Sequence, residues 1–250
     1  MFTDPEMSTF LTLPALSMLW LGAFVGAVAS GGAGFAFAIT AAAIRLHILE
    51  PIRAALLLLA GSLLLQLFTI WPLRHHIDMR RLSPFLIGGL IGMPIGVALL
   101  AHTRADVVKG TLGVFLTLFG IYGLAAPRLP LITGGGRGAD AAVGFAGGIL
   151  GGLGGYSGVL PTIWTQLRGW SKNEARGVYQ PFIVFAQFVT RVMLGFITFE
   201  KVAVWLFVLT LPPLVLGTWI GWTIYGRLDE RRFRQMLAIL LIVSGITLVV

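Results

Sequence analysis

Residue types that could do chemistry are few in this chain, and they lie within or beside glycine-rich apolar tracts. Ser157, in Gly155-Tyr156-Ser157-Gly158, is the hydroxyl best placed to act as a nucleophile. A serine nucleophile needs a neighbouring base, usually histidine. All 4 histidines precede Ser157 in the chain, at the edges of apolar tracts. We therefore do not expect an enzyme, and an intramembrane serine hydrolase using Ser157 is kept as the alternative.

Binding chemistry is better represented, by one arginine and three glutamines in apolar surroundings. Arg191 lies in FIVFAQFVTRVMLGFITF, and Gln187 and Gln180 precede it on the same helical face. Gln66 is the polar residue of the corresponding tract in the first half of the chain. A charge within a span usually contacts substrate or lines a cavity, although Arg191 could instead extend to the membrane surface. The glutamines could contact substrate or hydrogen-bond between helices.

Two clusters of small residues interrupt the apolar tracts at the start of each half. The first is Ser30-Gly31-Gly32, and the second is Gly154-Gly155-Tyr156-Ser157 followed by Pro161. Glycine and proline disfavour a helix interior, so we expect broken or re-entrant helices here. Broken helices in membranes line cavities and hold substrates. Close helix packing through small residues is the other interpretation.

Four arginines flank these interrupted tracts: Arg45, Arg53, Arg168 and Arg176. They could form a vestibule that attracts an anion, which backbone N–H groups at a broken-helix N-terminus would then bind. They could also only anchor helices and set their orientation. No Asp or Glu lies deep within a tract, so neither a carboxylate cation site nor a carboxylate proton relay is expected. Adjacent His75 and His76 do not share a helix face, and we expect no metal and no cofactor.

Composition sets the class of the protein. Of 250 residues, 57% are hydrophobic and 11% are charged, against roughly 25% charged in soluble domains. The formal charge of +8 comes from short basic clusters between apolar tracts, so no nucleic-acid partner is expected. About eight tracts are long enough to cross a bilayer, whose core needs roughly 20 apolar residues per helix. We expect an all-α, multi-pass protein of the cell (inner) membrane.

Internal similarity predicts two homologous four-span repeats in one transport domain, residues 1–250. Arg45 and Arg53 recur as Arg168 and Arg176, and Gly92-x-x-x-Gly96 recurs as Gly217-x-x-x-Gly221. The expected boundaries are 11–127 for repeat one, 128–140 for a linker and 141–250 for repeat two. If each interrupted tract crosses the membrane once, the repeats are parallel; if each folds back, they are inverted. Counting basic residues by the positive-inside rule does not decide between the two.

The segment from Gly144 to Phe182, GFAGGILGGLGGYSGVLPTIWTQLRGWSKNEARGVYQPF, resembles the signature of the sulfite exporter TauE/SafE family. The resemblance includes the glycine-rich broken helix, Pro161, the Leu-Arg-Gly-Trp turn and Tyr179-Gln180-Pro181. It implies outward transport of sulfite or an organosulfonate such as sulfoacetate. The family's triple-glycine run reads Gly155-Tyr156-Ser157-Gly158 here, which implies a different selectivity.

We therefore expect a transporter that exports a small anion through a site between the two repeats. The expected substrate-binding residues are Ser30, Gly31, Gly32, Gln66, Gly154, Gly155, Tyr156, Ser157, Gln180, Gln187 and Arg191. The alternatives are the hydrolase and a membrane scaffold without substrate. The sequence leaves open whether the protein forms a homo-oligomer and how transport is coupled to a source of energy.

Overall fold

All regular elements of the described residues are helical. The computed structural model describes residues 13–35, 37, 51–100, 105–125, 131–194 and 201–249. Its contacts divide the chain into two compact units: unit 1 is Met1–Leu65 with Thr198–Arg227, and unit 2 is Gln66–Ile197 with Leu228–Val250. The all-α class predicted from the sequence is confirmed.

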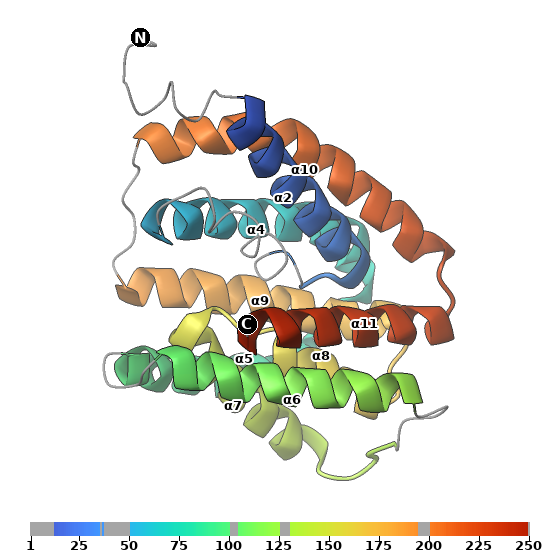
Figure 1. Cartoon of the computed structure of the whole chain (residues 1–250). Coiled ribbons are helices and arrows are strands. Elements are labelled where there is room, and N and C mark those ends of the chain that lie inside the picture. The colour runs from blue at the N-terminus through green and yellow to red at the C-terminus, as the bar shows by residue number, and fades with distance from the viewer. Residues whose placement is uncertain are drawn as a thin grey trace. The chain divides into compact units, whose positions relative to one another are not determined.

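Figure 1 labels the helices in chain order. They are α2 (Leu13–Ala33), α4 (Pro51–Leu73), the short 3-10 helix η1 (Arg74–His76), α5 (Met79–Leu100), α6 (Ala105–Ala125), α7 (Gly136–Gly154), α8 (Val159–Leu167), α9 (Lys172–Leu194), α10 (Lys201–Arg227) and α11 (Glu230–Val249). Three of them contain stretches long and apolar enough to cross a membrane: Leu16–Ala33, Met79–Leu99 and Val204–Arg227. A shorter apolar helix covers Gly110–Ala125. The full number of eight crossings stays a prediction.

Unit 1 is built on close packing of α2 against α10 (Figure 1). A Cβ at Gly221 would lie 2.3 Å from the carbonyl oxygen of Val28, and one at Gly217 would lie 2.6 Å from that of Phe24. The Gly217-x-x-x-Gly221 pair thus lets two backbones touch. Gly31 meets the Thr218 carbonyl in the same way, at 2.7 Å. The predicted interruption lies slightly later than Ser30-Gly31-Gly32, because α2 runs on to Ala33 and Gly34 then takes a φ of +85°.

In unit 2, glycines allow the same close backbone contact between α5 and α7. A Cβ at Gly88, Gly92 or Gly96 would lie 2.0, 2.1 or 2.2 Å from the carbonyl oxygen of Ala141, Phe145 or Ile149, respectively. From the other side, Gly144, Gly148 and Gly152 meet the backbone of α5. No side chain larger than hydrogen fits along this line, so the glycine spacing fixes how α7 lies on α5.

Two further contacts complete unit 2. Helices α6 and α11 run side by side (Figure 1), where Gly120 and Gly245 allow the same close approach. A buried aromatic and aliphatic cluster, Leu82, Phe85, Val178 and Phe182, joins α5 to α9. This cluster holds α9 in place relative to the glycine-packed pair α5–α7.

We predict that Gly92→Ala lowers the melting temperature of the detergent-purified protein. The added methyl group would overlap the Phe145 carbonyl, and overpacking of this kind typically costs about 1–3 kcal/mol. Gly138→Ala on α7 is the control, because a Cβ at Gly138 has nothing within 4 Å. A thermal scan in which both variants match the parent would show that the α5–α7 contact does not require glycine.

Candidate functional site

The second predicted interruption is present and separates α7 from α8. Helix α7 ends at Gly154, and Gly155 takes the left-handed φ of +78° that favours glycine. Two backbone bonds close this end, from the Gly155 N–H to Gly151 O at 2.8 Å and from the Tyr156 N–H to Leu150 O at 3.2 Å. Helix α8 starts only at Val159 and has only 9 residues. The apolar tract at 141–167 is therefore not one continuous helix.

Helix α8 folds back along α7 instead of continuing away from it. Ser157 lies against Gly151, where a Cβ would be 3.0 Å from the Ser157 Cβ, and Pro161 lies against Gly147 at 3.3 Å. Further along, the Trp164 indole N–H donates to Asp140 Oδ1 at 2.7 Å. At the end of α8, the Ile132 N–H donates to Leu167 O at 2.8 Å. Later residues of α8 thus meet earlier residues of α7, which defines an antiparallel hairpin.

Arg168 and Asp140 tie the open end of this hairpin. Arg168 Nη1 donates to the carbonyl oxygens of Ile132, Thr133 and Gly134 at 3.3, 3.4 and 3.1 Å. Its Nη2 lies 3.5 Å from Asp140 Oδ1, and its guanidinium lies over the Trp164 ring. We expected the Arg168 side chain to line a vestibule. It instead hydrogen-bonds to backbone carbonyl groups before α7 and pairs with Asp140. The buried Asp140 was not singled out from the sequence.

The turn of the hairpin contains polar groups that are deeply buried. Ser157 is 1% exposed and Thr162 is 0% exposed. Neither hydroxyl has a hydrogen-bond partner among the described residues. No side chain caps the N-terminus of α8 at Gly158. In the first turn of α8, the Val159 N–H donates to Tyr156 O at 3.2 Å and Pro161 has no N–H, so the Leu160 N–H and the helix dipole are what this end offers a ligand. This arrangement suits an anion with several oxygens.

A second buried polar group joins α4 to α9. Gln180 Nε2 donates to Gln66 Oε1 at 3.0 Å and to Thr69 Oγ1 at 2.9 Å. Gln180 Oε1 accepts from Arg176 Nε at 3.2 Å. Arg176 and Gln180 are both 0% exposed. We refer to Gln66, Thr69, Arg176 and Gln180 as the arginine–amide network.

The structure places the remaining predicted residues on several different elements. Gln187 and Arg191 are part-buried on α9, about 10 and 16 Å beyond Gln180 along the helix axis at 1.5 Å per residue. Tyr156 is part-buried beside the hairpin turn. Ser30, Gly31 and Gly32 belong to unit 1. Arg45 lies outside the described residues, as does the side chain of Arg53.

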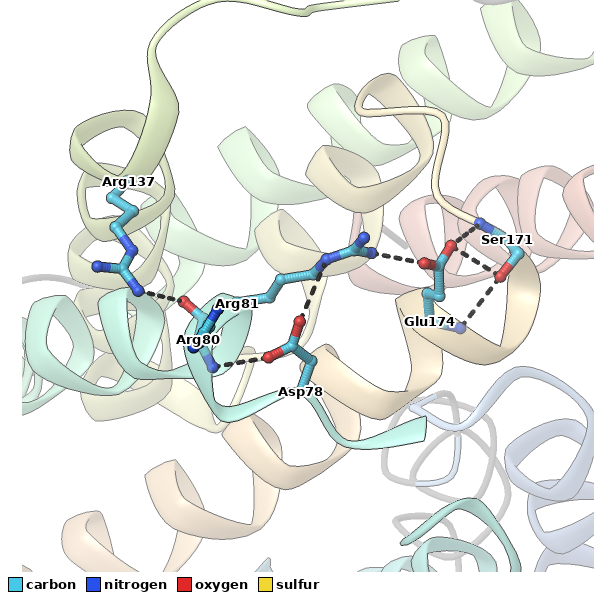
Figure 2. A network of polar contacts seen from close by, with 6 residues as sticks. All are labelled: Asp78, Arg80, Arg81, Arg137, Ser171 and Glu174. Atoms are coloured by element: carbon cyan, nitrogen blue, oxygen red, sulfur yellow. Dashed lines mark hydrogen bonds and ion pairs between the residues drawn. The ribbon is translucent and has the colours of Figure 1, made fainter. Parts of the chain in front are cut away.

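One end of unit 2 gathers charged side chains, and we call it the basic end: residues 74–81, 131–140, 168–176 and 228–234. Arg137 Nη2 donates to Arg80 O at 3.4 Å, and Arg81 Nη1 donates to Glu174 Oε1 at 2.8 Å (Figure 2). The Lys172 N–H donates to Glu230 Oε2 at 2.9 Å. Both ends of the α7–α8 hairpin therefore lie on this side of the unit.

A capping box at the start of α9 was missed in the sequence, although its Ser-x-x-Glu pattern is a known signal. Glu174 Oε2 accepts from the Ser171 N–H at 3.0 Å and from its hydroxyl at 2.9 Å (Figure 2). The Ser171 N–H is the main cause that lowers the pKa of Glu174 below its ordinary 4.5. The Ser171 hydroxyl and Arg81 lower this pKa further, against the opposing effect of partial burial.

In a comparison with protein families, the sulfite exporter TauE/SafE model matches residues 18–248 of the chain. The chain belongs to the sulfite exporter TauE/SafE family. This confirms the resemblance seen in Gly144–Phe182 and makes the protein a member of a family of membrane transporters. No curated protein and no solved structure matches it.

The glycine-broken helix that resembles the TauE/SafE signature is therefore a helical hairpin in this protein. Its turn carries Ser157. Within the described residues, no three His, Asp or Glu side chains gather as a metal site. The charged groups near the hairpin are arginines and the carboxylates that pair with them. The arrangement can bind and orient an anion.

We predict that Gln180→Leu destabilises the protein strongly. The change removes one hydrogen bond each from Gln66, Thr69 and Arg176 at once, and each such buried bond contributes about 0.5–1.5 kcal/mol, more where a charged group takes part. Gln166→Leu is the control, since Gln166 makes a single bond to Thr162 O in its own helix. Equal melting temperatures for the two variants would contradict a stabilising arginine–amide network.

We also predict a pH-dependent contribution of Glu174 to stability. Because its folded pKa lies below the ordinary 4.5, the contribution is complete at neutral pH and is lost as the pH falls through the folded value. The parent should therefore melt above Glu174→Gln at pH 7, and the gap should shrink below pH 4.5. A gap that stays constant across this range would exclude such a contribution from Glu174.

Proposed function

We propose that this protein exports a small anion, sulfite or an organosulfonate such as sulfoacetate, across the cell (inner) membrane. The observation that carries the proposal is the uncapped N-terminus of α8 with the buried Ser157 hydroxyl beside it. The Leu160 N–H, the helix dipole and the Ser157 hydroxyl together can replace part of the hydration of an oxyanion. Family membership supports the same class of cargo.

The depth of this site supports a role in transport. Helix α8 has 9 residues, so its N-terminus lies about 13 Å from its C-terminus. That C-terminus is held at the basic end by Leu167 and Arg168. With the basic end at the membrane surface, the site falls near the middle of a hydrocarbon core of about 30 Å. Transporter sites near the midplane are commonly built from interrupted helices.

Contacts within unit 2 also support a site between the two expected repeats. Helix α5 belongs to residues 11–127, and it packs against α9 and against α7, most of which lies in residues 141–250. The arginine–amide network likewise joins Gln66 to Gln180 across the same boundary. The two halves show matching features, since α4 and α9 each have 23 residues. Glycines of α5 and α10 also each pack against the first helix of the other half.

The hairpin favours inverted repeats over parallel ones. Because α8 returns to the side from which α7 starts, the basic segments of unit 2 share one side. By the positive-inside rule that side is cytoplasmic. An inside-negative potential then favours exit of an anion by ~2.3 kcal/mol per charge per 100 mV. Export by facilitated diffusion needs no coupling ion.

The hydrolase alternative is less well supported. The two histidines among the described residues, His75 and His76, are exposed at the basic end. The Ser157 hydroxyl has no hydrogen-bond partner in the described part of the chain, so no base there activates it. If Ser157 were a nucleophile, Ser157→Ala would abolish turnover completely. If Ser157 only binds the anion, the same change would only weaken binding.

We predict that Ser157→Ala raises the half-saturation concentration for sulfite efflux from proteoliposomes by about tenfold, the value of one hydrogen bond to a charged group. Ser244→Ala in α11 is the matched control, because Ser244 is also 0% exposed and its hydroxyl also has no partner among the described residues. Efflux of sulfite, sulfate, sulfoacetate and taurine is compared. Absence of flux for all four would contradict the proposed function, and equal effects of the two variants would contradict this site.

A further inference from the structure

A polar cavity lies at the basic end of unit 2, apart from the hairpin turn. Its volume is about 250 Å³, and its lining comes from the η1–α5 connection and the first turns of α9. The lining residues are His75, His76, Ile77, Asp78, Arg81, Glu174 and Val178. Arg81 was not singled out as a binding residue from the sequence.

Arg81 is the cation of this cavity, and the chain holds it in a fixed position. Its Nη1 donates to Glu174 Oε1 at 2.8 Å, and its Nε lies 3.6 Å from Asp78 Oδ2 (Figure 2). The guanidinium carbon lies 5.0 Å from the centre of the Trp170 ring. Stacking on an aromatic ring orients the guanidinium while leaving its edge open to hydrogen bonding. The side chain remains 38% exposed, so solutes can reach it.

The two carboxylates beside Arg81 are held in different ways. Asp78 accepts the Arg80 N–H through Oδ1 at 2.8 Å, as expected for a residue that caps the start of α5. Glu174 is anchored through Oε2, which accepts from both the N–H and the hydroxyl of Ser171. Only Glu174 Oε1 contacts Arg81. The Arg81–Glu174 bond can therefore open without disturbing the capping box of α9.

Sulfite and sulfonates offer a guanidinium the same oxygen pair as a carboxylate. From this geometry we propose that Arg81 is an intake site for the transported oxyanion, at which the Glu174 carboxylate occupies the anion position until substrate displaces it. The inference rests on the proposed function, because it assigns the place where the same cargo first binds. Arg80 and Arg137 lie close by (Figure 2) and raise the local concentration of anions.

Contacts on α9 link this site to the interior. Glu174 and Arg176 are separated by one residue in the first turns of α9. A Cβ at Gly177 would lie 2.3 Å from the His76 carbonyl oxygen, so η1 is pressed against the same turn. Asn173 Nδ2 also lies 3.4 Å from His76 Nε2. Substrate binding at Arg81 thus releases the ion pair between α5 and the helix that carries the arginine–amide network.

The test is calorimetric titration of sodium sulfite into the full-length, detergent-purified protein carrying Ser157→Ala, which weakens the hairpin site. Arg81→Gln should weaken binding by about tenfold or more, as expected for hydrogen bonds to a charged group. Glu174→Gln should strengthen binding by about threefold, since it removes a partly exposed competitor while glutamine still completes the capping box. The matched control is Arg232→Gln, which removes the same charge from an exposed pair with Asp229 at the basic end.

An Arg232→Gln affinity within twofold of the parent, together with the two opposite shifts, is the expected result. Equal weakening by Arg81→Gln and Arg232→Gln would mean that the basic end acts only through its diffuse field, and would overturn the intake site. Weaker binding in Glu174→Gln would also overturn it, because Glu174 would then support the anion position and not compete for it. Failure of the proposed function is distinguishable, since it appears as absent flux in proteoliposomes whatever the titration shows.

Discussion

The return of α8 along α7 is the constraint on which the rest of this protein depends. A helix that stops inside a hydrocarbon core leaves backbone groups that lipid cannot satisfy. Here Gly155 closes the end of α7, and the contacts of Trp164, Asp140 and Arg168 hold the returning helix. The N-terminus of α8 is then left within the protein, where an anion can complete it. The proposed site, its depth in the membrane and its sidedness all depend on that one fold-back.

Packing makes the fold-back stable without a large apolar core between the helices. Lipid tails are as apolar as leucine, so helices in a membrane gain little from burial alone. Unit 2 relies on backbone contact through the glycines of α5 and α7 and on hydrogen bonds between buried side chains. The arginine–amide network places a guanidinium and two amides at 0–1% exposure. Such a network is rigid when complete, which suits a scaffold that carries a binding site.

The sequence predicted the class and the interruption, but not the direction of the chain after it. Glycine and proline at 151–161 indicate a break by local energetics alone. Whether the chain then crosses or returns depends on contacts such as Ile132 with Leu167, which no local pattern contains. Arg176 was expected in a vestibule and is fully buried, because its partner Gln180 is fixed by Gln66 from a distant helix. The Ser171–Glu174 capping box was readable and was overlooked.

The most direct test of the fold-back uses the absence of cysteine in this chain. Single cysteines at Thr133, before α7, and at Ser171, after α8, are both exposed positions at the basic end. They are labelled with a membrane-impermeant maleimide in right-side-out and inverted vesicles. The account predicts that both positions react only in inverted vesicles, on the cytoplasmic side. Labelling from opposite sides would show that the tract crosses the membrane once, and would contradict the hairpin and the site built on it.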